Sequence, residues 1–306
     1  MIPDDFNFSR YLEAKRSVDD RSLNRLVWET LLQSLPVTSV DKPLKVIEVG
    51  AGIGTMLARM VDWDLIQFAD YIGIDLQAEN IEYARHHLAR WARGKGLSLE
   101  ETREGLVFSG EDTRIEVNLV AADIFTFIQS TEKMPCDLFV AHAFLDLVPL
   151  PDTLVQLFNW LQNDALFYFS INYDGLTVLE PVIDETFDDL VLTLYHDTMN
   201  ERNLNGQKYG DHQTGRHLLD YISQAGGSVL AAGGSDWIVY PIQGEYRAKE
   251  GYFLHYIIET IYHALYDHPL MDQERFSQWI DLRHEQVEQS KLVYIAHQVD
   301  FCGKIK

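Results

Sequence analysis

The sequence has little cysteine, no long apolar run and few basic side chains. Its 306 residues include two cysteines, Cys136 and Cys302, too few for a disulfide framework or a four-cysteine zinc site. No stretch approaches the roughly 18 uninterrupted apolar residues that a membrane-spanning helix needs. Residues 1–5 lack the basic and apolar segments of a signal peptide. We therefore expect a cytoplasmic protein with no membrane partner.

The shortage of basic residues also bears on the partner. The chain carries 25 Lys and Arg against 47 Asp and Glu, a formal net charge of −22. A nucleic-acid binder needs a cationic surface toward the phosphates, so no nucleic-acid partner is expected. The sequence contains 11 histidines. None has the His-Glu-x-x-His spacing of a zinc site, and no metal is expected.

Short apolar segments alternate with helical ones over residues 44–171. Segments that are apolar throughout are typical of parallel strands buried on both faces. The pattern predicts a Rossmann-like, doubly wound α/β fold with a mostly parallel sheet and helices on both faces. The predicted strands cover residues 44–49, 71–75, 106–121, 137–141 and 165–171.

The remaining segments suggest additions to this core. We predict an N-terminal helical segment over residues 1–40, and a core over 41–306 with insertions at about 175–212 and 249–288. The first insertion is acidic and polar, and the second is strongly helical. They are expected to form a lid or an interface, and a homo-oligomer stays an open alternative. The polar stretch 94–105 is predicted to be a loop.

The most informative segment is the glycine-rich run Glu48–Gly54, which reads Glu-Val-Gly-Ala-Gly-Ile-Gly. It follows a predicted strand and precedes a predicted helix, so its backbone amides lie where a ligand can approach closely. The second predicted strand ends in Asp75, and a carboxylate there can accept both hydroxyls of a ribose. This context favours a nucleotide-type cofactor over a plain packing turn.

Two kinds of cofactor compete for this loop. The dinucleotide fingerprint needs Gly or Ala three residues after Gly52, where this chain has Thr55. The Gly-x-Gly-x-Gly spacing instead fits a loop that holds a nucleoside without a diphosphate. An NAD-dependent oxidoreductase is therefore the weaker alternative.

Three motifs in order, Glu48–Thr55, Tyr71–Asp75 and Ala121–Ile124, resemble the class I S-adenosylmethionine-dependent methyltransferases. The resemblance implies S-adenosyl-L-methionine as cofactor and a seven-stranded sheet that ends in an antiparallel hairpin. It implies that the glycines flank the methionine and ribose, that Asp75 binds the ribose and that Asp123 binds the adenine amine. The cofactor-binding residues it implies are Glu48 (toward the amino group), Gly50, Ala51, Gly52, Gly54, Asp75, Leu76, Asp123, Ile124 and His142.

Near the N-terminus lies a dense charged set that includes Lys15, Asp19 and Arg21. In several methyltransferases an N-terminal helix covers the cofactor, and Tyr11 or Arg21 would then touch its carboxylate. A solvated amphipathic helix explains the same charges.

Methyl transfer from a sulfonium needs alignment of the reactants and exclusion of water. A base is needed only if the acceptor must lose a proton. The candidate catalytic residues are His142 and Tyr173, which follow the fourth and fifth predicted strands. A histidine that shapes the cofactor pocket, and an Asx-type turn at Asn172–Gly175, are the alternatives. Candidate acceptor-binding residues are Asn172, Tyr173, His196 and Trp237. A place on the polar surface is the simpler explanation of His196, and packing in the core or lid is the simpler explanation of Trp237.

The leading hypothesis is thus a methyltransferase acting on a small-molecule acceptor enclosed by the insertions. The alternatives are a methyltransferase acting on protein or tRNA, and a non-catalytic cofactor-binding or assembly module that uses residues 249–288 as its interface.

Overall fold

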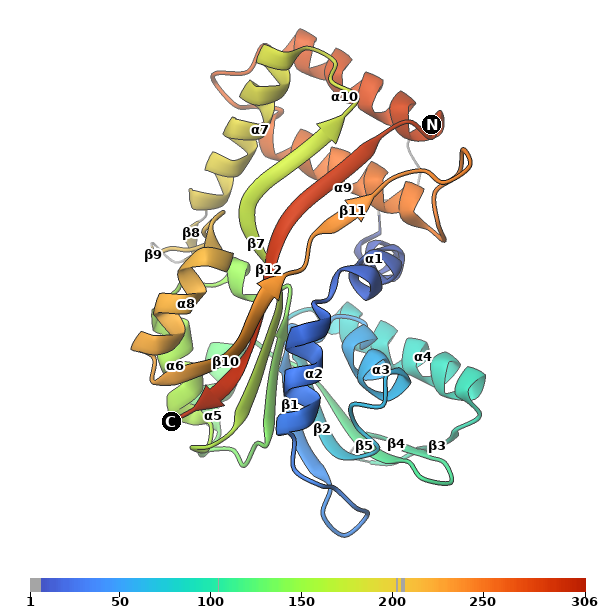
Figure 1. Ribbon diagram of the computed structural model, residues 1–306, viewed down its shortest axis with the longest axis vertical. Coiled ribbons are helices and arrows are strands. Elements are labelled where there is room, and N and C mark those ends of the chain that lie inside the picture. The colour runs from blue at the N-terminus through green and yellow to red at the C-terminus, as the bar shows by residue number, and fades with distance from the viewer. Residues whose placement is uncertain (1–6, 104, 202, 205–206) are drawn as a thin grey trace.

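Figure 1 shows the computed structural model, which describes residues 7–103, 105–201, 203–204 and 207–306. The helices are α1 Phe8–Ser22, α2 Arg25–Ser34, α3 Thr55–Asp62, α4 Ala78–Lys95, α5 Ile124–Ser130, α6 Asp152–Trp160, α7 Glu185–Asn200, α8 Thr214–Gln224, α9 Glu250–Leu265 and α10 Gln273–Glu288. The strands are β1 Leu44–Val49, β2 Phe68–Asp75, β3 Ser98–Glu101, β4 Leu106–Ser109, β5 Arg114–Ala121, β6 Leu138–His142, β7 Leu166–Glu180, β8 Asn203–Leu204, β9 Gln207–Lys208, β10 Gly227–Gly234, β11 Trp237–Val239 and β12 Val293–Ile305.

The central sheet has the order β10-β12-β7-β6-β1-β2-β5-β4-β3, with β11 also paired to β12. Its middle strands, from β7 to β5, pair in parallel, and the strands at both edges pair antiparallel. The predicted α/β fold with a doubly wound, mostly parallel sheet is confirmed. The count of seven strands was wrong: within the described part of the chain the sheet has ten, because β3 and β4 extend one edge and β11 adds to β12.

The strand order reverses between β1 and β6, since β1 is followed along the chain by β2 on one side and later by β6 on the other. In open α/β sheets, ligands bind at the carboxyl ends of the strands at this reversal, the topological switch point. The segments after β1, β2, β5 and β6 are therefore the ones to examine for a site.

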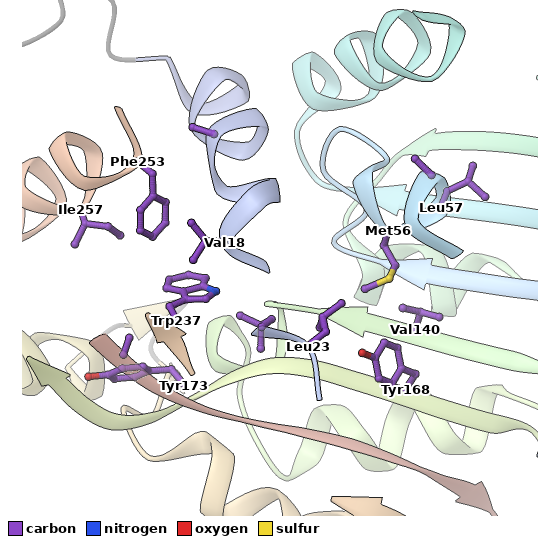
Figure 2. Packing of buried hydrophobic residues seen from close by; sticks show 14 of the residues in the cluster. Val18, Leu23, Met56, Leu57, Val140, Tyr168, Tyr173, Trp237, Phe253 and Ile257 are labelled. Atoms are coloured by element: carbon purple, nitrogen blue, oxygen red, sulfur yellow. The ribbon is translucent and has the colours of Figure 1, made fainter. Parts of the chain in front are cut away.

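Helices cover both faces of the sheet (Figure 1). One hydrophobic cluster packs α1, α2, α3, α4 and the upper helices α7, α9 and α10 against one side, and a second packs α6 and α8 against the other. Figure 2 shows the first cluster near α1, where Val18, Trp237 and Phe253 come together from α1, β11 and α9. Among the described residues, no helix is both long and apolar enough to cross a membrane.

Two long strands account for the main errors in the expected organisation. β7 continues through the predicted turn at Asn172–Gly175 and pairs there with β12, for example Asn172 with Val299. The prediction of that turn was wrong, because Asn172–Gly175 lies within β7. The prediction of a loop over 94–105 was also wrong, because this stretch contains β3. The insertion predicted over 175–212 begins as strand and continues as α7; its residues 202 and 205–206 lie outside the described part. The helical prediction for 249–288 is confirmed by α9 and α10.

Candidate functional site

The loop after β1 turns through three glycines in the left-handed region, Gly50 at φ +66°, Gly52 at +53° and Gly54 at +77°. Side-chain-bearing residues rarely adopt these angles, so the glycines are required by the turn itself. The Ala51 amide donates to the carbonyl of Ile74 in the neighbouring strand, at 3.1 Å. The loop is thereby held against the end of β2.

Asp75, the last residue of β2, organises this loop. Its Oδ2 accepts the Gly52 amide at 2.8 Å, and its Oδ1 accepts the Gln77 amide at 2.9 Å and the Asn80 side-chain amide at 3.0 Å. The carboxylate is 8% exposed. A carboxylate offers about four acceptor positions, so three donors leave Oδ2 one position for a further hydroxyl.

Glu48 lies beneath the loop and is fully buried. Burial raises its pKa to about 8, although the hydroxyl of Tyr71, which donates to Glu48 Oε2, works in the opposite direction. Glu48 therefore carries a proton at neutral pH. A cation placed beside it would favour release of that proton.

The other predicted cofactor residues follow β2 and β5. Asp123 is half-buried and caps α5, accepting the Thr126 amide at 2.9 Å on Oδ1. Ile124 is buried beside it, and Leu76 is exposed just after β2. Since β2 and β5 pair in parallel up to Asp75 and Ala121, these residues lie along one edge of the sheet.

His142 ends β6 on the other side of the switch point. Its Nε2 lies 3.0 Å from Asp19 Oδ2, and its Nδ1 lies 2.8 Å from the hydroxyl of Ser170. Burial lowers the pKa of His142 to about 4, and the nearby charge of Lys15 adds to this effect. A neutral His142 thus donates from Nε2 to Asp19 and accepts from Ser170 at Nδ1, which engages both ring nitrogens.

Asp19 is the centre of a buried polar cluster. It also binds the ammonium of Lys15, 2.6 Å away, and accepts the indole N–H of Trp237 at 2.9 Å. Burial alone would raise the pKa of Asp19, but Lys15 and then His142 outweigh it and hold this pKa well below its usual range. The cluster joins α1, β6 and β11 through a single carboxylate.

Helix α1 lies directly over the glycine loop. A Cβ added to Gly52 would be 3.2 Å from Leu12 Cδ1, and one added to Gly50 would be 2.7 Å from Phe144 Cδ2. Two side chains therefore cover the loop, one from α1 and one from the segment after β6. The alternative of a solvated amphipathic helix does not account for Lys15 and Asp19, which α1 buries.

Tyr173 and His196 form a separate pair on the extension of β7. The hydroxyl of Tyr173 lies 2.7 Å from His196 Nε2 and 2.7 Å from Thr177 Oγ1. Burial lowers the pKa of His196 to about 4, with the stacked ring of His212 adding to the effect. Asn172 is fully buried and donates to the carbonyl of Val299 at 2.8 Å, which fixes it within the sheet.

Two residues with left-handed backbone angles lie beside His142 and its partner Ser170. Ala143 and Ile171 have φ angles of +49° and +58°, the latter rare for a β-branched residue. The buried carboxylate of Asp300 accepts the Ile171 amide at 2.7 Å and the Asn24 amide at 2.8 Å. The Ala143 amide donates to the carbonyl of Ser170 at 2.8 Å. Strain held in place in this way is typical of functional sites.

The structure thus sorts the predicted residues into three groups. The first gathers around the glycine loop and Asp75, the second joins His142 to Trp237 through Asp19, and the third pairs Tyr173 with His196. Sequence reasoning missed Asp19, Ser170, Leu12 and Phe144 as parts of the site. Only Asp19 left a signal, as an acid within the charged N-terminal set. No cluster able to hold a metal occurs among the described residues.

Comparisons with known proteins give a likeness in fold. No protein-family model and no curated protein matches the chain. A Bacillus halodurans protein assigned as a methyltransferase is 10% identical, with a TM-score of 0.48 over 90% of this chain and 97% of that one. A cyclopropane synthase from Mycobacterium tuberculosis is 10% identical, with a TM-score of 0.44 over 99% of this chain and 100% of that one.

A third similar structure is geranyl diphosphate C-methyltransferase from Streptomyces coelicolor, solved with Mg²⁺, geranyl diphosphate and S-adenosyl-L-homocysteine. It is 11% identical, with a TM-score of 0.43 over 91% of this chain and 79% of that one. The identities and TM-scores are too low for any of these proteins to say what this chain binds.

Proposed function

We propose that the chain is an S-adenosylmethionine-dependent methyltransferase that moves a methyl group to a small-molecule acceptor. The observation that carries the proposal is the hydrogen bond from the Gly52 amide to Asp75 at the switch point between β1 and β6. It joins a turn of left-handed glycines to a carboxylate, at the edge where α/β sheets bind ligands.

The residues at this edge suit the cofactor chemically. Asp75 keeps an acceptor position for a ribose hydroxyl, and Glu48 can release its proton beside an amino group. Leu76 offers exposed apolar surface immediately after Asp75, and Ile124 follows Asp123. The residues that we propose to hold the cofactor are Glu48, Gly50, Ala51, Gly52, Gly54, Asp75, Leu76, Asp123, Ile124 and His142.

We propose that binding at this loop displaces α1 and Phe144, because Leu12 of α1 and Phe144 lie against the two glycines. The face of α1 that must separate contains Lys15 and Asp19 as well as Ala14 and Val18. Half of that face is polar, so its separation exposes less apolar surface than an ordinary core helix would. We propose that α1 is the cover of the cofactor site.

The cofactor supplies an electrophilic methyl group on a sulfonium, and the chain aligns the acceptor and excludes water. We propose that Tyr173 and His196 orient the acceptor. Asn172 would hold β7 in place, and Trp237 would line the acceptor site. While α1 is closed, His142 donates from Nε2 to Asp19 and accepts from Ser170 at Nδ1, so its Nε2 becomes a base only after Asp19 moves away and the ring proton shifts to Nδ1. A covered site and a net charge of −22 favour a small acceptor over tRNA.

The test is calorimetric titration of the full chain with S-adenosylmethionine and S-adenosylhomocysteine. Loss of the ribose hydrogen bond to this charged acceptor should make Asp75→Ala bind more weakly by about 1.5–3 kcal/mol. Asp70→Ala is the matched control, because Asp70 lies at the opposite end of the same strand, and it should bind like wild type.

Micromolar binding that is lost in Asp75→Ala and kept in Asp70→Ala would support the site, and screening of small acceptors for S-adenosylhomocysteine formation would follow. Absence of binding to the folded wild-type chain would overturn the proposal. Binding without turnover on any acceptor would instead favour the non-catalytic module.

A further inference from the structure

A second hollow lies apart from the glycine loop, between α1, the carboxyl-terminal half of α4 and the residue before α9. It is a groove of about 610 Å³. Its walls carry four cations, Arg16, Arg90, Lys95 and Lys249, and two carboxylates, Glu13 and Asp62. None of the predicted cofactor or acceptor residues contributes to it.

Among the residues that line the groove, the four cations face two carboxylates, and Arg16 also lies 3.7 Å from Asp20 Oδ2, outside the groove. Glu13 binds Arg90 at 3.0 Å and Lys249 at 2.9 Å, while Asp62 binds Arg16 at 3.0 Å and Lys95 at 3.0 Å. Glu13 also accepts the hydroxyl of Tyr83, and Asp62 the indole N–H of Trp91. The groove therefore has two positive charges in excess, in a chain whose net charge is −22.

One wall of the groove also has an unused polar atom. The Nε2 of His87, on α4, is buried and has no hydrogen-bond partner. Burial lowers the pKa of His87 to about 4, and the charges of Arg16 and Arg90 add to this effect. A buried nitrogen without a partner is costly, and the His87 ring would have to turn toward the groove for a ligand oxygen to satisfy it.

We propose that this groove binds a dianionic phosphate group, as free phosphate or as the phosphate of a small phosphomonoester. Two excess charges match a dianion, and the guanidinium and ammonium groups are the donors that phosphate recognition uses. A polyanion is disfavoured, because the rest of the chain is strongly acidic. The proposal stands whether or not the chain transfers methyl groups.

A bound phosphate would also tie structural elements together. Arg16 belongs to α1, Arg90 and Lys95 belong to α4, and Lys249 immediately precedes α9. An anion held by all of them fastens α1 to its neighbours and stabilises the folded chain, since any ligand that binds only the native state does so.

The experiment is calorimetric titration of the full chain with inorganic phosphate at constant ionic strength, with glycerol phosphate and malonate as further arms. We expect saturable binding of phosphate that is at least tenfold weaker in Arg90→Gln/Lys249→Gln. The control is Arg114→Gln/Lys304→Gln, which removes two surface cations whose ion pairs lie elsewhere, with Glu116 and Asp164; it should bind like wild type. Lys95→Gln is a single variant at a half-exposed position, should the double variant fail to fold.

The three titrations distinguish free phosphate from a phosphomonoester as the ligand. Tighter binding of glycerol phosphate than of phosphate identifies a phosphomonoester, and the reverse order identifies free phosphate. Malonate binding as tightly as phosphate, no saturable binding, or equal binding by the folded Arg90→Gln/Lys249→Gln or Lys95→Gln variants would each overturn the proposal.

Discussion

The two sides of the switch point are built from different kinds of contact. On the β1 and β2 side, Asp75 binds Gly52 at a distance of 23 residues along the chain and Gln77 at a distance of 2. On the β6 side, His142 binds Asp19 at a distance of 123 residues, and Asp19 binds Trp237 at a distance of 218. We call the first side, the glycine loop with Asp75, the cradle, because its contacts are local. We call the second side, in which Asp19 of α1 binds His142 and Trp237, the closure, because it depends on the position of α1.

The two sides also respond to pH in opposite directions. Glu48 has a pKa raised to about 8, so the folded state holds a proton that the unfolded state has lost. His142 has a pKa lowered to about 4, so the unfolded state gains a proton first. Acid should therefore weaken the closure, while alkali should weaken the cradle.

The largest effect is expected at the closure. Asp19→Ala should lower the free energy of unfolding by about 3–5 kcal/mol, because it leaves Lys15 and His142 in a buried site without their common partner. Urea unfolding monitored by circular dichroism measures this loss. Glu29→Ala, at an exposed position on α2, should stay within about 0.5 kcal/mol of wild type. Equal stability of the two variants would contradict the account of Asp19.

The next effect concerns pH. Stability from His142 should be present above pH 6.5 and lost as pH falls toward 4, with a slope of up to about 1.4 kcal/mol per pH unit. Stability from Glu48 should be present below pH 4.5 and lost as pH rises toward 8. Denaturant unfolding across this range should show a shallower acid limb in His142→Gln and a shallower alkaline limb in Glu48→Gln. The same pH profile in all three chains would contradict both assignments.

A smaller effect is expected where the glycine loop contacts Leu12 of α1. Gly52→Ala places a side chain at φ +53° and 3.2 Å from Leu12 Cδ1, and should cost about 1–2 kcal/mol of stability. Adding Leu12→Ala should recover the steric part, which a double-mutant cycle measures. Gly94→Ala, where a Cβ has nothing within 4 Å, is the control and should be neutral or stabilising. A Gly52→Ala chain as stable as this control would refute the close fit.

The smallest expected effect is the number of protons released when the cofactor binds, and this prediction rests on the proposed cofactor. Placing the cofactor's amino group beside Glu48 should release up to about one proton at pH 7, because the ligand cation stabilises the carboxylate. Calorimetry in buffers of different ionisation enthalpy measures this release. It should vanish in Glu48→Gln; an equal release by that variant would assign the proton to another group.

The local cradle could be predicted from the sequence, and the closure could not. The strand, the glycine run and Asp75 follow one another in a pattern whose geometry is set by turn conformations and parallel pairing. Asp19 gave no comparable signal, because its partners His142 and Trp237 are brought to it only by tertiary packing of α1. The turn expected at Asn172–Gly175 failed for a similar reason: pairing with β12 on both sides carries β7 through this segment, with an irregular register between Ala296 and Gln298.

The most direct test of the covered cradle is the rate at which S-adenosylhomocysteine associates, measured by stopped-flow tryptophan fluorescence. If α1 must separate from the glycine loop before binding, Asp19→Asn should raise the association rate constant at least tenfold over wild type, with Glu29→Ala unchanged. Binding to wild type and Asp19→Asn at the same rate, within the 10⁵–10⁷ M⁻¹s⁻¹ typical of unhindered association, would contradict the role of α1 as a cover.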